Sequence, residues 1–345
     1  MFKTTGDILD AGQASIEANL AAHIAAGAGD ESTVRANSDA LDRMKLVPSV
    51  AAGVGDAHTA TTVLGLDLQI PVVTAPMGPV ELIHQQGAAA IADGADRAGA
   101  ATTIALTSAP SLDVAAGSND NALFQLYWWG DRDWVLSMLR RAGAAGYRAV
   151  VITVDVPDYG TRWVDIRNGF DHHGQMALPN LTDAPTERDV RLSFQRRLDF
   201  ADIAWAVDVS PVPIVLKGVL SAADARQAID AGVSAVYVSN HGGRALAGQI
   251  GTMDALPEIV EEVAGTVAII VDGGFSTGED IAKGLAAGAD LVAIGRPIAY
   301  ALAAEGATGV ESYLNLLQSD LHTALTVLGA STPGDLSTSH LRRIG

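Results

Sequence analysis

The chain of 345 residues contains no cysteine. It therefore cannot form a disulfide, bind zinc through thiolates or use a cysteine nucleophile. Basic residues are also scarce, with 22 Lys and Arg against 40 Asp and Glu, which gives a formal net charge of −18. Nucleic acids and anionic membrane surfaces are bound by basic patches, so this balance argues against both as partners.

Long apolar segments are missing as well. No run of about 18 apolar residues free of charge stands out, so we expect no membrane-spanning helix. The first residues lack the basic start and apolar core of a signal peptide, and we therefore expect a cytoplasmic location. Charged residues make up only 18% and hydrophobic residues 48%, which predicts a large buried core and argues against disorder.

Short apolar runs alternate with Ala-rich helical stretches along most of the chain. An Ala-Gly pair shortly before the apolar run recurs at 145–146, 231–232 and 287–288. Glycine at that place is typical of a helix C-terminus, and a continuous apolar run is typical of a strand buried on both faces. Eight such runs are present, at 71–75, 102–106, 124–127, 149–155, 213–218, 235–240, 267–274 and 291–296.

Eight strands that alternate with helices predict an α/β fold of the (β/α)8 TIM-barrel type over most of residues 65–310. An open, doubly wound sheet is the alternative, because the number of strands alone does not force closure. We expect one domain over 1–345. It includes an N-terminal helical segment at 1–64, a polar lid insertion at 157–202 after the fourth strand, and C-terminal helices.

Polar or ionisable groups end six successive apolar runs. In a TIM barrel the C-terminal strand ends carry the active site, so these side chains are expected to share one cavity. Glycine-rich turns after the last two runs also offer backbone N–H groups to a phosphate. No residue set indicates a metal site. The polar and ionisable groups at the six strand ends are Gln125 and Tyr127, Thr153 and Asp155, Lys217, Ser239 to His241, Asp272 to Gly274, and Gly295 with Arg296.

The sequence SNHGGR at 239–244 is the sharpest local signal. A His at a strand end is suited to abstracting a proton near neutral pH, and an Arg close by is suited to holding a carboxylate with two hydrogen bonds. Asp155 would orient the imidazole of His241 if the two are close. The alternative is a structural His that is bonded to backbone.

Several motifs, taken in order, resemble one family. TAPMG, FQLY, ITVDVPDYGTRWVDIRNGF, VLKGV, SNHGGR and VDGGFSTGEDIAKGLAAGADLVAIGRP look like those of the FMN-dependent 2-hydroxy acid oxidases and dehydrogenases. The resemblance runs from about residue 27 to the C-terminal helices. It implies an FMN cofactor, oxidation of an (S)-2-hydroxy acid to the 2-oxo acid, and oxygen, a quinone or another electron acceptor. It also implies a homo-oligomer such as a tetramer.

The resemblance assigns roles residue by residue. Catalysis falls to the base His241, its partner Asp155, Tyr127 on the substrate oxygen, Lys217 near the flavin, and the carboxylate-binding Arg244 and Arg162. Besides Lys217, the cofactor would be held by Pro76, Met77, Gly78, Gln125, Thr153, Ser239, Asp272, Gly273, Gly274, Ser276, Gly295 and Arg296.

Some positions depart from the family pattern. His23 stands where the family usually has a substrate-binding Tyr, so it either contacts substrate or lies on a helix face away from it. Ser276 replaces an Arg that binds phosphate. The segment 105–109 lacks a bulky aromatic residue, and the lid looks short. These departures indicate a wider pocket.

The wider pocket leaves room for an alternative substrate, namely a larger aryl hydroxy acid or modified amino acid of a specialised biosynthetic pathway. A silent flavin-binding barrel and a non-redox barrel acting on a phosphorylated metabolite are less favoured, because His241, Lys217 and Arg244 are all present.

Overall fold

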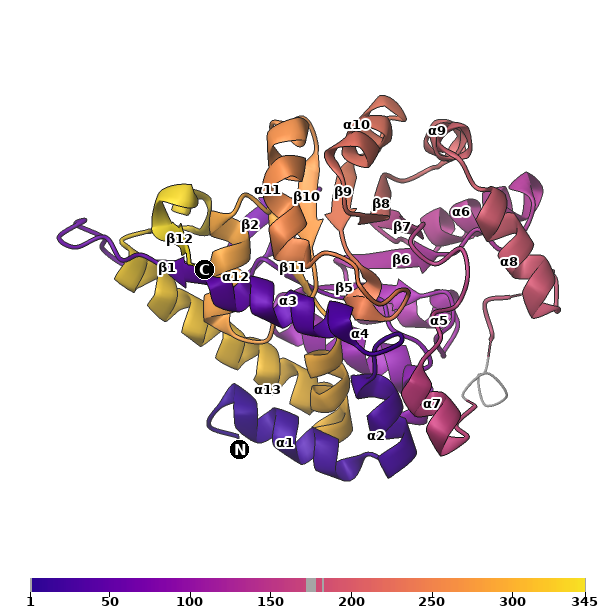
Figure 1. The fold of residues 1–345 in the computed structure, drawn as a ribbon, viewed down its shortest axis with the longest axis horizontal. Helices are drawn as coiled ribbons and strands as arrows, with labels where there is room; N and C mark the ends of the chain where they lie inside the picture. Colours follow the sequence, from indigo (N-terminus) through magenta and orange to yellow (C-terminus); the bar gives the residue numbers. More distant parts are fainter. Residues whose placement is uncertain (1, 172–177, 182, 345) are drawn as a thin grey trace.

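Eight parallel strands close into a barrel in the computed structural model, which describes residues 2–171, 178–181 and 183–344 (Figure 1). Around the barrel the order is β10, β11, β4, β5, β6, β7, β8, β9. The predicted TIM barrel is confirmed, and the open sheet is excluded. The strands are β4 (Val72–Thr74), β5 (Ala101–Ala105), β6 (Ala122–Leu126), β7 (Ala149–Thr153), β8 (Ile214–Val219), β9 (Ala235–Val238), β10 (Ala268–Val271) and β11 (Leu291–Ile294).

Helices connect these strands and cover the outside of the barrel. Several begin at a side chain that caps free N–H groups, such as Ser221 before α10 and Thr277 before α12. Gly146, Gly232 and Gly288 adopt positive φ just beyond helix ends, as the repeated Ala-Gly pair predicts. The helices are α4 (Gly87–Arg97), α5 (Leu112–Ala115), α6 (Arg132–Ala144), α9 (Phe200–Val209), α10 (Ala222–Asp230), α11 (Thr252–Val263), α12 (Gly278–Ala286) and α13 (Arg296–Leu328).

The inside of the barrel is filled by side chains and closed at one end. Val73, Val151 and Tyr237 belong to this interior cluster, together with Leu66 and Leu68 of a hairpin made by β2 (Thr61–Val63) and β3 (Leu66–Leu68). The hairpin lies just before the N-terminal end of β4, so it plugs the N-terminal mouth. The C-terminal mouth is left for a binding site.

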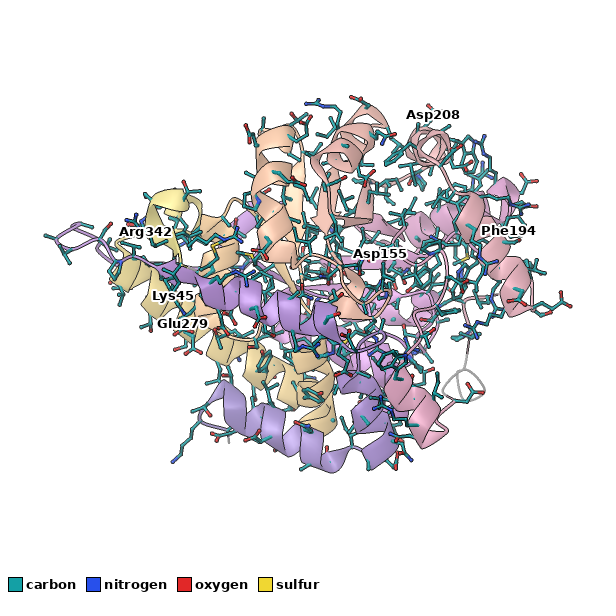
Figure 2. The ribbon with its side chains drawn as sticks, viewed as in Figure 1. Lys45, Asp155, Phe194, Asp208, Glu279 and Arg342 are labelled. Atoms are coloured by element: carbon teal, nitrogen blue, oxygen red, sulfur yellow. The ribbon has the colours of Figure 1, made fainter. Side chains whose placement is uncertain are left out.

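The N-terminal segment mixes helices and strands. It holds α1 (Thr5–Ser15), α2 (Ala18–Ala25) and α3 (Ser32–Arg43), followed by β1 (Met44–Leu46). The prediction of a helical segment at 1–64 is therefore right only as far as α3. β1 pairs antiparallel with β12 (Leu341–Arg343) near the C-terminus. Lys45 and Arg342 face each other across this ladder (Figure 2).

The insertion after β7 is shorter than predicted. It contains α7 (Trp163–Asn168) and α8 (Arg188–Arg197), but α9 already belongs to the helices around the barrel and packs against α6 and α10. The lid expected over 157–202 therefore ends before Phe200. Residues 172–177 and 182 of that segment lie outside the described residues. Among the helices that the structure describes, none is both long and apolar enough to cross a membrane.

Candidate active site

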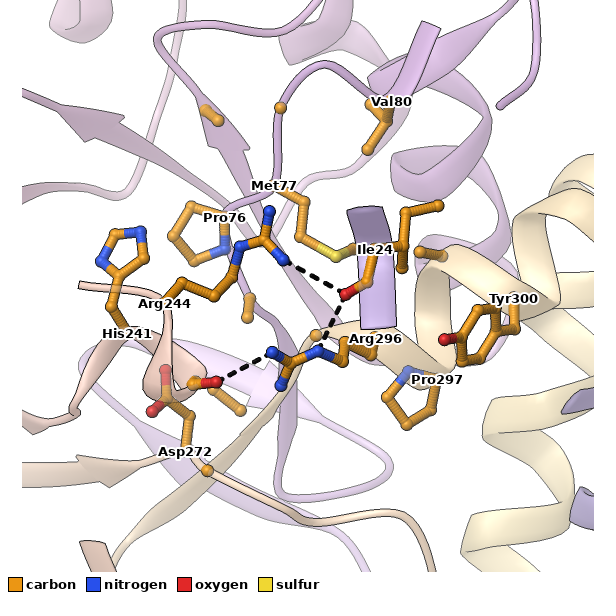
Figure 3. Close-up of a pocket in the computed structure, with 18 of the residues that line it drawn as sticks. Ile24, Pro76, Met77, Val80, His241, Arg244, Asp272, Arg296, Pro297 and Tyr300 are labelled. Atoms are coloured by element: carbon orange, nitrogen blue, oxygen red, sulfur yellow. Dashed lines mark hydrogen bonds between the residues drawn. The ribbon is translucent and has the colours of Figure 1, made fainter. Parts of the chain in front are cut away.

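A cavity of about 550 Å³ occupies the C-terminal mouth of the barrel. Its volume falls in the range of cofactor and small-molecule sites. Figure 3 shows part of its wall, where Arg244 and Arg296 both donate to the carbonyl oxygen of Ile24. Most of the residues predicted from the sequence line it, namely His23, Pro76, Met77, Gly78, Gln125, Tyr127, Lys217, His241, Arg244, Asp272, Gly273, Gly274, Gly295 and Arg296.

A smaller cavity of about 80 Å³ adjoins the first one. The two share Gly78, Tyr127, His241, Arg244 and His23. Its remaining wall comes largely from the segments after β6 and β7. The structure thus places the predicted substrate residues around one small space, with a wall of Trp129, Val156, Tyr159 and Arg162.

His241 is oriented by a buried carboxylate. Its Nδ1 lies 2.9 Å from Oδ1 of Asp155, a buried carboxylate. Burial alone would raise the pKa of Asp155, but Lys217 and His241 outweigh it and lower that pKa below its usual value. An ionised Asp155 accepts the hydrogen bond, so Nδ1 carries the imidazole proton. The lone pair of Nε2 is then free to accept a proton on the cavity side.

Tyr127 stands next to that lone pair. Its hydroxyl oxygen is 3.5 Å from Nε2 of His241. Burial raises the pKa of Tyr127 well above its usual value, so the side chain stays a neutral phenol. A neutral phenol can donate a hydrogen bond to a substrate oxygen that lies next to both side chains.

Lys217 lies between two buried carboxylates. Its Nζ donates to Oγ of Ser239 at 2.9 Å and lies 3.8 Å from Asp155 and 3.9 Å from Asp272. Ser239 in turn donates to Oδ2 of Asp272 at 3.0 Å. Burial raises the pKa of Asp272, and its Oδ1 has no hydrogen-bond partner among the described residues. Burial and the neighbouring Asp272 raise the pKa of Tyr237, so this buried phenol lies close to the Asp272 carboxyl group.

Arg244 and Arg296 both bind the C-terminal end of α2. Arg244 donates to the carbonyl oxygens of His23, Ile24 and Ala26, and Arg296 donates to those of Ile24 and Ala26. The last carbonyls of a helix lack partners within it, and the helix dipole favours cations there. The two guanidinium groups therefore fasten the N-terminal segment onto the barrel mouth.

Three predicted cofactor residues lie outside the cavity wall. Gln125 donates to Oγ1 of Thr153 at 3.1 Å, so Thr153 supports a wall residue from behind, as Ser239 does for Lys217. Ser276 faces Asp280, whose Oδ2 accepts its backbone N–H at 3.2 Å. A cofactor role for these three residues stays a prediction.

Thr107 and Asp165 are among the site residues that sequence reasoning did not single out, together with the wall residues Trp129, Val156 and Tyr159. Thr107 lines both cavities. It belongs to the segment 105–109, which lacks a bulky aromatic residue. Asp165 accepts a hydrogen bond from Nε of Arg162 at 2.8 Å and lies 2.9 Å from Nδ1 of His23. Its spacing of three residues from Arg162, on one helical face, is the sequence signal that could have found it.

The wall fits a flat, phosphorylated cofactor such as FMN. Gly273 and Gly274 adopt φ of 102° and 95°, and a Cβ on Gly273 would lie 2.6 Å from Oγ1 of Thr252. Glycine is therefore required where this turn packs closely against Thr252 and Asn37 beside the cavity. Buried Lys217 supplies a cation for a polar ring edge. No group of three or more His, Asp or Glu that could hold a metal occurs in the described part of the chain.

Replacing Gly78 with Ala is expected to destabilise the fold by about 1–3 kcal/mol, the usual effect of overpacking. A Cβ on Gly78 would lie 2.8 Å from the backbone oxygen of Thr107, which cannot rotate away. Urea unfolding measures the change. Gly6→Ala is the control, because its methyl would meet only Oγ1 of Thr4 at 3.7 Å. Equal stability of Gly78→Ala and wild type would contradict the steric argument.

The stability of the protein is expected to fall as the pH is lowered from about 6.5 towards 4. Burial, with the charges of Arg244 and Arg162, lowers the pKa of His23 from 6.5 to about 4 despite Asp165. In that range the unfolded chain binds a proton that the folded protein does not, so up to about 3 kcal/mol of stability is lost.

Urea unfolding at pH 7 and pH 4.5 measures this effect, with His23→Gln as the comparison because it removes the titrating group. The same loss of stability in both proteins would show that His23 does not contribute.

Comparison with known proteins gives one consistent family. The sequence model of the family described as FMN-dependent dehydrogenase matches residues 12–343. The chain is 41% identical to an L-lactate oxidase of Nostoc sp. over 332 residues, which covers 91% of both chains. It is 37% identical to a 4-hydroxymandelate oxidase of Amycolatopsis orientalis, which covers 90% of both.

Solved structures agree with these relatives. A mandelate oxidase with (S)-2-phenylpropionate superposes with a TM-score of 0.91 at 34% identity and covers 99% of this chain and 98% of that one. A variant of mandelate oxidase with an FMN adduct superposes with a TM-score of 0.89 at 34% identity, over 97% and 98% of the two chains.

Proposed function

Since the chain belongs to the FMN-dependent dehydrogenase family, we propose that His241 is the base with which it oxidises its substrate. The protein is an FMN-dependent oxidoreductase that converts an (S)-2-hydroxy acid to the 2-oxo acid. The observation that carries the role of His241 is its hydrogen bond from Nδ1 to Asp155, with Nε2 turned towards Tyr127 and the cavity. FMN supplies the acceptor for the two electrons of this oxidation.

His241 takes a proton from the substrate at Nε2. The imidazolium that results is stabilised by the ionised carboxylate of Asp155, 2.9 Å from Nδ1. Tyr127 donates a hydrogen bond from its phenolic O–H to the substrate oxygen and keeps its proton. Because Asp155 is buried with Lys217 beside it, its charge is in place before substrate arrives and needs no rearrangement.

Two arginines bind the substrate carboxylate. Arg162 and Arg244 line the small cavity on the side of Tyr127 and His241. Burial and the nearby charges of Arg162 and Arg296 lower the pKa of Arg244 to about 9, so it remains protonated at neutral pH. A planar guanidinium matches the geometry of a carboxylate.

The larger cavity would hold FMN. Lys217 would place a fixed positive charge beside the ring system, and the backbone at Pro76, Met77 and Gly78 would form one wall. The glycines after β10 and β11, with Asp272 and Arg296, would surround the ribityl chain and phosphate. A positive charge at Lys217 would favour the extra negative charge that the ring gains on reduction.

A larger, aromatic substrate is the second candidate. Trp129 stacks on Tyr127 with ring centroids 4.8 Å apart, and Trp129 and Tyr159 both line the small cavity. Such a wall favours an aryl side chain on the substrate. A hydroxy acid or modified amino acid with a bulky side chain would use the same base and arginines.

The test is anaerobic titration of the purified protein with 2-hydroxy acids of increasing size, namely glycolate, (S)-lactate, (S)-mandelate and (S)-4-hydroxymandelate. Bleaching of the yellow flavin is expected with at least one acid, and the R enantiomers of the three chiral acids serve as controls. If none of the acids bleaches a bound flavin, the assigned substrate class is wrong. Preference for the two aryl acids would select the second candidate.

The electron acceptor, the oligomer and the location stay predictions. Mixing the reduced enzyme with aerated buffer or a quinone identifies the better acceptor.

Exposed Trp163 and Ile166 on α7 offer apolar surface to a homo-oligomer such as a tetramer. Light scattering measures the oligomeric state. A cytoplasmic location is checked by cell fractionation.

A further inference from the structure

His23 is bonded through both ring nitrogens. It lies on α2, is 4% exposed and faces both cavities. Its Nδ1 is 2.9 Å from Oδ2 and 3.0 Å from Oδ1 of Asp165, and its Nε2 is 3.1 Å from a terminal nitrogen of Arg244. The ring thus connects a carboxylate of α7 with a guanidinium from the loop after β9.

These contacts fix the protonation state of His23. An arginine nitrogen can only donate, so Nε2 of His23 must offer its lone pair to Arg244. The proton then sits on Nδ1 and is donated to the carboxylate of Asp165. Burial would raise the pKa of Asp165, but the hydrogen bonds from Arg162 and His23 lower it, so the carboxylate is charged. His23 is neutral, and its single N–H is already used.

Asp165 also holds the second arginine. Its Oδ2 accepts from Nε of Arg162 at 2.8 Å. One carboxylate therefore orients Arg162 directly and Arg244 through His23. The two guanidinium groups carry like charges in a poorly solvated space, and Asp165 provides the compensating negative charge.

The guanidinium of Arg244 is fixed at both ends. One terminal nitrogen donates to the carbonyl oxygens of His23, Ile24 and Ala26, and the other donates to Nε2 of His23. Bonds at both ends set the plane of the group. A plane that is set in advance lowers the entropy lost when a carboxylate binds with two hydrogen bonds.

We propose that Asp165 and His23 are positioning residues that set the orientation of Arg244 and Arg162 for the substrate carboxylate. His23 then acts through Arg244, in place of the direct substrate contact that the family resemblance implies for this position. The inference rests on the proposed function, in which the two arginines bind that carboxylate.

His23→Phe is the main test, because it keeps a ring and removes both hydrogen bonds. We expect KM for the best hydroxy acid of the panel to rise about tenfold while kcat at saturation changes less than twofold, the loss expected for one hydrogen bond to a charged group. His23→Gln offers an acceptor to Arg244 and should restore part of the affinity. Asp165→Asn should raise KM more than His23→Phe, since it disturbs both arginines.

A matched pair of ligands separates positioning from a merely structural role. The wild type should bind the acid more tightly than its carboxamide, and His23→Phe should reduce this preference about tenfold without changing carboxamide binding. His23→Phe and Asp165→Asn should also be non-additive in KM. Flavin absorbance and urea unfolding report whether each variant is folded. If His23→Phe does not fold, His23→Gln and Asp165→Asn carry the same comparison.

Other outcomes would overturn the inference. An unchanged preference for acid over carboxamide in folded variants would contradict positioning. A fall in kcat with unchanged KM would place His23 in the oxidation step itself. Because the wild type is tested in the same titrations, failure of every acid to bleach its flavin would overturn the proposed function instead.

Discussion

Replacing His241 with Gln is expected to slow anaerobic flavin reduction by about 10²–10⁴-fold while FMN stays bound. The substitution removes the lone pair at Nε2 that faces Tyr127 and the hydrogen bond from Nδ1 to Asp155. The side chain of His241 is not fully buried, so its replacement leaves mainly Asp155 without a hydrogen-bond partner that it had before. Stopped-flow absorbance of the flavin measures the rate.

Two further variants control this experiment. His241 has φ of 58°, a left-handed conformation that Asn adopts more readily than Gln, so His241→Asn tests the base with less backbone strain. His322→Gln removes an exposed imidazole from α13 and should leave the rate unchanged. Reduction by either His241 variant at close to the wild-type rate would assign the base to another residue.

Replacing Lys217 with Met is expected to destabilise the fold by about 3–5 kcal/mol at pH 7. The side chain is 3% exposed, and its ammonium is the cation beside both Asp155 and Asp272. Without it, two buried carboxylates face each other with no compensating charge. Urea unfolding measures the loss, which should shrink at low pH as the carboxylates become protonated.

Lys283→Met is the matched control for Lys217→Met. Lys283 pairs with a single carboxylate, that of Asp280, three residues earlier on α12. Pairs of this kind near the surface contribute about 1 kcal/mol or less. Comparable losses in the two variants would show that the charges around Lys217 are solvated, contrary to the burial seen here.

The fold was predictable because continuous apolar runs mark the strands, and Ala-rich helical stretches separate them. The runs at 149–155 and 267–274 were predicted as whole strands, yet β7 ends at Thr153 and β10 at Val271. The chain leaves the sheet there because Asp155 and Asp272 point into polar surroundings of the barrel mouth. Closure of the sheet, by contrast, depends on strand pairing that no single segment encodes.

The candidate site was predictable where it follows strand ends and unpredictable where distant segments meet. His241 and Lys217 come directly from that rule. The contact of His23 with Asp165 joins residues 142 positions apart, and nothing local in either segment indicates it. Ser276 was predicted from its sequence position to line the cavity. The turn instead directs it to Asp280, whose carboxylate accepts its backbone N–H.

The pairing of β1 with β12 determines when the N-terminal segment can complete its native contacts during synthesis. Leu46 pairs with Leu341, so the early segment waits for about 295 residues before its partner exists. At 5–20 residues per second, this takes roughly 15–60 s on the ribosome. α1 has a similar wait for α13, on which it packs. Until then the apolar face of α1 has no native partner, whereas α2 can already be fastened to the barrel mouth by Arg244 and Arg296.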